Sequence, residues 1–197
     1  MQKRHLLHIT YFLNFFFGLH AFSVLYVNSS VLSGAVGERF VGVIYALAAI
    51  STIAVLSTVP RILQGVGDRR FTLATVLVEI VALLGLAMST DPVTVVVLFI
   101  IHSVALRVIL VDLDVFLESA STEDDTGVVR GTFLTAGNIA LVIAPILVGL
   151  LLGSTEHYNK VYLFAAVVLT PAALMLFFSF KHFKDPRYVR TPLLKTL

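Results

Sequence analysis

The sequence predicts an all-α integral membrane protein with six transmembrane helices. Hydrophobic residues make up 58% of the 197 positions, charged residues only 13%, and the mean hydropathy is +0.96. A soluble domain carries charge at about a quarter of its positions. The apolar residues also form long continuous runs, which short polar segments interrupt. Together these observations predict a chain that crosses a lipid bilayer several times.

Each apolar run is long enough to cross the hydrocarbon layer, which takes roughly 20 residues of helix. The runs are too long and too continuously apolar for the alternating strands of a β-barrel. The first follows a basic start, as in a secretory signal. It continues to about Leu32 without a cleavage pattern, however, and is expected to be retained. The predicted spans are 9–32, 41–59, 71–89, 93–118, 128–152 and 161–180.

Short segments rich in Gly, Pro, Ser, Asp and Asn separate the spans, as expected where membrane helices end. In order they read SGAVGERF, PRILQGVGDRR, STDP, STEDDTG and GSTEHYNK. The chain thus divides into a short N-terminus (1–8), a membrane domain (9–180) and a basic tail (181–197). We expect the tail to lie beside anionic lipid headgroups, as a stop-transfer anchor does.

The positions of Lys and Arg predict the orientation, because cytoplasmic loops carry an excess of both. If the N-terminus is cytoplasmic, eleven basic residues fall on the cytoplasmic side, and only Arg39 and Lys160 fall outside. The remaining one, Arg107, lies within a span. We therefore expect an integral protein of the cell (inner) membrane with both termini in the cytoplasm.

The composition excludes several classes of function. The chain has no cysteine, so disulfides, thiolate metal sites and thiol catalysis are excluded. Its basic residues are scattered between spans, which argues against nucleic acid as a partner. The sequence contains no HExxH motif, Ser/His/Asp spacing or Gly-rich phosphate loop in the required setting. We expect a protein without enzymatic activity, cofactor or metal.

The fourth predicted span, 93–118, has an apolar surface that is interrupted by a polar stripe along one face. Ionisable groups at bilayer depth cost roughly 2.5–3.5 kcal/mol each, so they normally face a bundle interior or an aqueous cavity. Asp112 is rotated off the stripe. At 100° per residue the stripe contains Ser103, Arg107, Val111, Asp114 and Glu118.

Two interpretations of these charged side chains stay open. In the first, Arg107 binds an anionic group or a partner carboxylate, and Asp112 or Asp114 takes up and releases a proton. In the second, the charged groups form a structural cluster with Arg130 that latches the cytoplasmic side. Glu118 is expected at the membrane interface, beside that latch.

A second polar stripe runs along the first span, through Thr10, Asn14, Phe17, Ala21, Val24 and Asn28. Asn14 is a candidate for a hydrogen bond into a cavity or to a neighbouring helix. Asn28 should lie near the outer mouth, with His20 and Tyr26 close enough to contribute.

Three further ionisable residues, two histidines and one glutamate, each lie alone in an apolar run. His20 and His102 are single histidines among apolar residues, which are more often packed than proton-relaying. Glu79 lies near the middle of the third span, where a lipid-facing charge would be costly unless protonated, paired or turned inward. It could instead mark a contact with another chain.

Two segments resemble motifs of the major facilitator superfamily of transporters. The family's loop between spans two and three contains a Gly, an Asp, a basic residue, a second Gly and two further basic residues. Here Pro60, Gln64 and Gly65 occupy the first three positions, followed by Gly67, Arg69 and Arg70. By this resemblance Gln64, Gly67, Arg69 and Arg70 belong to the cytoplasmic gate, with Gln64 supplying hydrogen bonds but no charge.

The second resemblance lies in span five. The family's antiporter motif there is a series of glycines and one proline, and the same spacing is present here. Small residues at this spacing let a neighbouring helix approach closely, and the proline bends the span. The matching positions, implied to pack against a neighbouring helix, are Gly131, Ala140, Ala144, Pro145 and Gly149.

The fourth span of the family often carries an Arg, and Arg107 corresponds to it, although Leu110 and Val111 replace the Gln and Gly that follow. The resemblance implies one six-helix half of such a transporter, folded as a 3+3 inverted-repeat bundle. It also implies alternating access, with the first and fourth spans lining a cavity.

One half holds only half a cavity, since the substrate site of such transporters lies between two halves. We therefore expect a half-size secondary transporter for an unidentified small solute, with proton coupling. A second six-helix unit, as a homodimer or a separate half, would complete it. The alternatives are a non-transporting six-span scaffold or assembly subunit, and the N-terminal fragment of a twelve-span transporter.

Overall fold

The protein is an all-helical bundle in the computed structural model, which describes residues 3–122, 125–155 and 157–180. The basic tail, 181–197, lies outside the described residues. Within them there is no strand. The helices are α1 (Lys3–Leu25), α2 (Asn28–Val36), α3 (Glu38–Leu56), α4 (Val59–Val66), α5 (Asp68–Met88), α6 (Pro92–Ala120), α7 (Thr126–Leu152) and α8 (Asn159–Ser179).

Six helical segments of the described chain are long and apolar enough to cross a membrane. Five are single helices, and the sixth is α1 continued by α2. A protein embedded in the membrane by six helices, as the composition predicts, is therefore confirmed.

Two helices differ from the predicted spans. The first span breaks at Tyr26 and Val27 and continues as α2 to Val36, four residues beyond the predicted end at Leu32. The predicted break after span two contains a helix of its own, α4, which begins at Val59 and ends at Val66, just before Gly67. Gly37 and Gly67 end their helices with φ of 87° and 81°, a backbone conformation that favours glycine.

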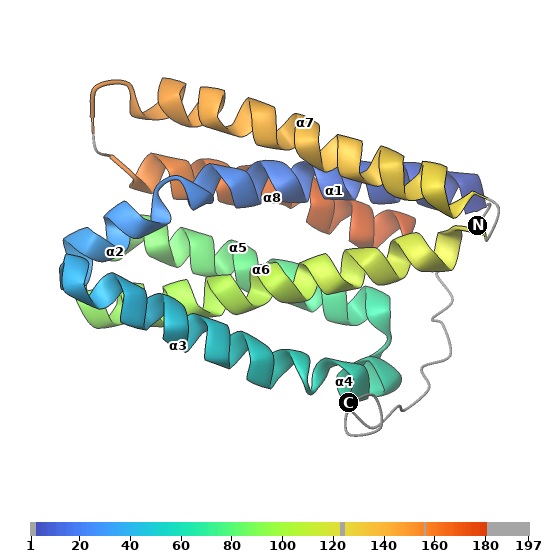
Figure 1. Ribbon diagram of the computed structural model, residues 1–197, viewed down its shortest axis with the longest axis horizontal. Coiled ribbons are helices and arrows are strands. Elements are labelled where there is room, and N and C mark those ends of the chain that lie inside the picture. Colours follow the sequence, from blue (N-terminus) through green and yellow to red (C-terminus); the bar gives the residue numbers. More distant parts are fainter. Residues whose placement is uncertain (1–2, 123–124, 156, 181–197) are drawn as a thin grey trace.

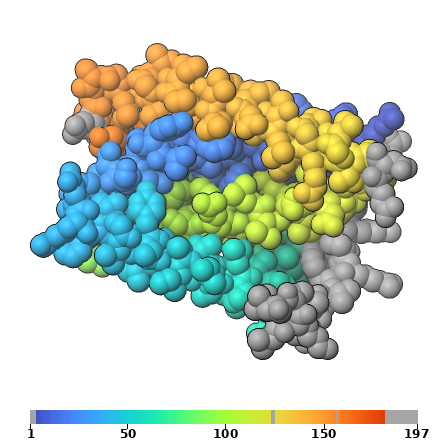
Figure 2. Space-filling model, in the orientation of Figure 1, coloured from blue at the N-terminus to red at the C-terminus, as the bar shows by residue number. Residues whose placement is uncertain are grey.

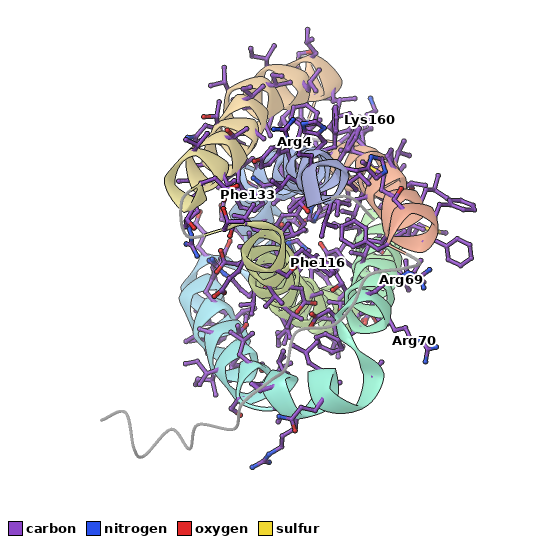
Figure 3. The ribbon with its side chains drawn as sticks, turned by 90° about the vertical axis from the view of Figure 1, so that its right-hand side faces the viewer. Arg4, Arg69, Arg70, Phe116, Phe133 and Lys160 are labelled. Carbon is purple, nitrogen blue, oxygen red and sulfur yellow. The ribbon has the colours of Figure 1, made fainter. Side chains whose placement is uncertain are left out.

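The helices form a front and a back (Figure 1). Helices α1 and α6 lie at the centre, α7 packs along α1, and α3 packs along α6. Helices α5 and α8 pack together behind them. The space-filling view shows α1 and α6 exposed between α7 and α3 (Figure 2). An apolar core fills the bundle, and the end view shows Phe116 inside it and Arg70 directed outward (Figure 3).

Basic side chains concentrate at the end of the bundle where α1 begins and α8 ends, here called the basic end. Among the described side chains Arg4, Arg61, Arg69, Arg70 and Arg130 lie at helix termini or in α4 at this end, whereas Arg39 and Lys160 begin helices at the opposite end. This division is the one that the positive-inside rule uses to orient a membrane protein.

The turn before α6 is capped by Asp91, opposite the basic end. Its carboxylate accepts hydrogen bonds from the hydroxyl and the backbone N–H of Thr94, at 2.7 and 2.8 Å. Both hydrogen bonds stabilise the carboxylate and hold the pKa of Asp91 below its ordinary value. The bond from the hydroxyl has the larger effect and the bond from the N–H the smaller one. The cap satisfies one of the free N–H groups at the helix start.

Helices α1 and α7 approach closely at Gly18. A Cβ added there would lie 3.2 Å from the Cβ of Ala140 and 3.6 Å from the carbonyl oxygen of Gly137. A Cβ at Gly42, inside α3, would meet nothing within 4 Å. A side chain at position 18 would therefore crowd α7, whereas position 42 has open space around it.

We expect Gly42→Ala to raise the unfolding free energy by about 0.5–1 kcal/mol, because alanine is the better helix former. In Gly18→Ala the added methyl group should crowd α7 and cost about 1–3 kcal/mol of unfolding free energy, which exceeds the gain in helix propensity. This variant should melt at a lower temperature than wild type. Thermal unfolding of the two purified variants in the same detergent measures the difference. Equal melting temperatures would contradict the close α1–α7 contact.

Candidate functional site

A buried hydrogen-bonded cluster joins three helices in the middle of the bundle. Glu79 of α5 contacts His20 of α1 and His102 of α6 through one carboxylate oxygen, Oε1. The distances are 2.9 Å to Nε2 of His20 and 2.6 Å to Nδ1 of His102. Side-chain exposure is 0% for His20 and Glu79 and 2% for His102. We call these three residues the His–Glu–His triad.

Helix periodicity places Glu79 in the core. The buried face of α5 contains Asp68, Thr72, Val76, Glu79 and Leu83, at the spacing of one helix face. The sequence alone does not decide the role of Glu79, and it favours packing for the two histidines. The structure instead turns all three inward at the same depth.

Two flanking contacts indicate where the protons of the triad lie. Nδ1 of His20 lies 2.8 Å from the carbonyl oxygen of Phe17, which can only accept, so Nδ1 carries a proton. The Asn28 amide nitrogen lies 3.4 Å from Nε2 of His102 and donates to it, so the proton of that ring is on Nδ1. The hydroxyl of Tyr162 donates to Oδ1 of Asn28 at 2.8 Å and orients the amide.

This arrangement leaves one exchangeable proton between His20 and Glu79. His102 donates its Nδ1 proton to Oε1, and the contact of the same oxygen with Nε2 of His20 needs one more proton. That proton lies either on Nε2, giving an imidazolium–carboxylate pair, or on Oε1, giving a neutral pair. In both forms the pair has no net charge. Loss of the proton leaves a single buried negative charge.

The donor set of the triad is also one that a metal ion can use, because the three ligand atoms lie within 4.8 Å of one another. Two imidazole nitrogens and a carboxylate at about 2.0–2.1 Å from a zinc ion would lie about 3.3 Å apart. The observed separations of 2.6 and 2.9 Å are hydrogen-bond lengths. We therefore assign the cluster to shared protons. The second oxygen of Glu79, Oε2, is buried and has no hydrogen-bond partner in the described part of the chain.

A groove runs beside the triad, between α3 and α6, with a volume of about 360 Å³. His102 lines it and contacts Glu79, so one side chain connects the two sites. Arg107 lies near the middle of the 29-residue α6 and is exposed in the groove. No described carboxylate forms an ion pair with it. The other polar lining residues are Asn28, Tyr45, Thr52 and Ser103.

Asp112 lies in a separate buried cluster toward the basic end. Its Oδ2 accepts a hydrogen bond from the hydroxyl of Thr72 at 2.9 Å, and Oδ1 has no hydrogen-bond partner among the described residues. The buried Asp68, one turn before Thr72, interacts electrostatically with it. Asp112 thus faces α5, as its rotation off the polar stripe predicts, and not the groove.

The other charged residues of the α6 stripe are at the surface. Asp114 pairs with Arg130 across a distance of 3.8 Å, with about half of each side chain exposed. An exposed pair of this kind contributes at most about 1 kcal/mol. Glu118 is exposed on the same helix, nearer the basic end.

Among the residues assigned to a gate by resemblance, Arg69 connects two helices. Arg69 donates from Nε and Nη2 to the carbonyls of Leu176 and Phe177, at 3.1 and 2.5 Å, and ties α5 to the end of α8. Arg70 and Gln64 are exposed, and Gly67 forms the turn between α4 and α5.

Asn14 ties α1 to α7, since its amide nitrogen donates to the carbonyl of Phe133 at 2.7 Å. On α7 the small side chains of Ala140 and Ala144 are buried beside Leu19 of α1. A Cβ added at Gly131 or Gly149 would meet nothing within 4 Å. Pro145 is also exposed. Helix packing against α1 therefore uses two of the five positions that the span-five motif singles out.

No protein-family model matches the sequence, and no curated protein matches it. Membership of the major facilitator superfamily therefore stays a prediction from degenerate motifs.

Proposed function

We propose that the protein is a half-size, proton-coupled secondary transporter that moves a small solute by alternating access. A second six-helix unit, most simply another copy of the chain, would complete the pathway. The observation that carries this proposal is the connection between the groove and the buried triad through His102. A solute site and a proton site that share one side chain can influence each other directly.

The exposed face of α1, α3 and α6 supports pairing. A single bundle leaves the groove open at the side, where Arg107 would meet lipid at a cost of several kcal/mol. The same face presents exposed apolar side chains of α3, such as Ile50 at 64% and Ile53 at 70%. Two copies placed face to face would cover these side chains and enclose two grooves in one aqueous path.

The structure favours the triad over the aspartates as the proton carrier. Asp114 is exposed and paired with Arg130, and Asp112 lies on the far side of α6 from the groove. Glu79 is connected to the groove through His102 and shares one proton with His20. Asp112 retains a role as a polar contact that holds α5 to α6 near the basic end.

The proposed location is the cell (inner) membrane, with both termini in the cytoplasm. The concentration of Arg at the basic end supports this orientation. In this orientation α4 and the Arg69 contact to α8 lie on the cytoplasmic side. The groove then begins near the middle of the bilayer, because Arg107 and His102 lie in the central part of α6.

Cysteine accessibility tests the pathway, because the chain contains no native cysteine. We expect Ser103→Cys and Thr52→Cys, both in the groove, to react with a membrane-impermeant maleimide from each side of sealed vesicles. Val167→Cys is on α8, which does not line the groove, and it is 68% exposed; we expect it to face lipid and to react from neither side. Groove cysteines that stay as unreactive as the Val167 variant would contradict a transport pathway and favour a sealed scaffold.

A further inference from the structure

We infer that the groove binds a small organic anion of single charge, and that the anion moves together with one proton so that no net charge crosses. This inference rests on the proposed function and specifies its substrate class and stoichiometry. It follows from the unpaired charge of Arg107, the size of the groove, and the single exchangeable proton of the triad.

Arg107 requires a negative partner at bilayer depth. It is always charged, it lies near the middle of α6, and no described acid forms an ion pair with it. The two acids nearest in sequence are engaged elsewhere, since Asp112 accepts from Thr72 and Asp114 pairs with Arg130. An anion in the groove would supply the missing charge, and a guanidinium binds a carboxylate or sulfonate through two parallel hydrogen bonds.

The lining of the groove defines the rest of the ligand. Ser103 lies one turn from Arg107, and Thr52 and Tyr45 come from the facing helix α3, so three hydroxyl groups line the groove that would hold the anion. The apolar side chains of Leu25, Phe99 and Leu106 line the remainder. A volume of about 360 Å³ equals that of about a dozen waters, which suits an anion with a short apolar body.

The charges of the two sites explain the coupling. With anion and proton both bound, Arg107 is neutralised by the anion, and the His20–Glu79 pair has no net charge. With neither bound, the positive Arg107 and the negative Glu79 balance each other. With only one bound, the region carries a net charge of one unit. A net charge is costly in a low-dielectric bundle, so only the full and empty states should reorient.

The other described groups in contact with the triad leave this count unchanged. His102 from α6 accepts at Nε2 from the Asn28 amide and donates from Nδ1 to Glu79. Tyr162 from α8 keeps its proton in the hydrogen bond to Asn28, and Tyr45 of α3 lines the groove as a neutral phenol. The charge of the site is therefore set by Arg107, the anion and the one proton shared between His20 and Glu79.

Binding to the purified full-length protein tests the anion site without requiring transport. The probes are lactate, benzoate, methanesulfonate and acetate, with glycerol and choline as neutral and cationic controls. We expect at least one anion to bind and to take up about one proton per chain in weak buffer. Arg107→Gln should weaken this binding by about 10- to 100-fold, Arg107→Lys less, and Arg61→Gln, at an exposed site in α4, not at all.

Reconstituted vesicles then test the stoichiometry with the radiolabelled anion that bound. An inward proton gradient should accelerate its uptake, whereas a potassium diffusion potential set with valinomycin should leave the rate unchanged. Uptake that follows the membrane potential would overturn electroneutral movement. Absence of binding by all four anions, or equal binding by Arg107→Gln, would overturn the anion site.

The two tests separate the inference from the function on which it rests. Anion binding with proton uptake but no entry into vesicles would overturn the transporter and keep the site. Proton-coupled entry of a neutral or cationic solute, without anion binding, would overturn the anion inference and keep the transporter.

Discussion

Glu79→Leu is expected to destabilise the protein by about 3–5 kcal/mol, because it leaves two buried imidazoles without their acceptor. The hydrogen-bonding nitrogens of His20 and His102 would lose the one carboxylate that contacts them among the described residues, in a buried site. A variant with Leu at positions 20, 79 and 102 together should be as stable as wild type or more so, because it replaces the whole network with apolar side chains. Denaturant unfolding in mixed micelles compares the single and triple variants.

The same pair of variants separates structure from function. The triple variant should fold and still fail in every proton-coupled assay, since no exchangeable proton remains beside the groove. A triple variant as unstable as Glu79→Leu would mean that the surrounding helices require the polar network. A triple variant with wild-type proton coupling would contradict the role of the triad.

Glu79→Gln is expected to make alternating access independent of pH. In the Ser103→Cys background, labelling from one side relative to the other should change with pH by up to about tenfold per unit, as for linkage to one proton. The Gln side chain keeps the size and hydrogen-bonding capacity of Glu79 but has no titrating carboxylate. His20, His102, Tyr162 and Arg107 remain, so a lost pH response would be due to the carboxylate.

The control for this measurement is Asp112→Asn in the same background, since Asp112 lies in the separate cluster with Thr72. It should keep the pH response of the parent. If Asp112→Asn loses the pH response and Glu79→Gln keeps it, the proton carrier is the aspartate and not the triad. The sequence of α6 alone suggests that aspartate.

Hydrophobicity was sufficient to predict the six membrane helices, because the bilayer requires long apolar runs whatever their packing. It was not sufficient for the details at the breaks. The chain after span two forms α4 because Pro60 can begin a helix and Gly67 can end one, so a polar, Gly-containing segment became helix. The break at Tyr26 and Val27 occurs beside Asn28, whose inward contacts with His102 and Tyr162 depend on tertiary structure.

The stripe on α6 could be read from spacing alone, since one helix face carries Ser103 and Arg107 into the same groove and turns Asp112 away. The His–Glu–His triad could not be predicted from spacing. His20, Glu79 and His102 each occur alone in an apolar run, and only the relative depth and rotation of α1, α5 and α6 bring them together. A usable signal was present in the sequence: three ionisable side chains, each near the middle of a different span, have to avoid lipid and therefore tend to meet.

Proton entry into reconstituted vesicles tests the central claim most directly. Vesicles loaded with a fluorescent pH indicator would receive an ultrafiltrate of small cellular solutes at equal pH on both sides. We predict saturable acidification of the interior with the wild-type protein and the rate of protein-free vesicles with Glu79→Gln. A wild-type rate equal to that of protein-free vesicles, or an unchanged rate in Glu79→Gln, would contradict a proton-coupled pathway through the triad.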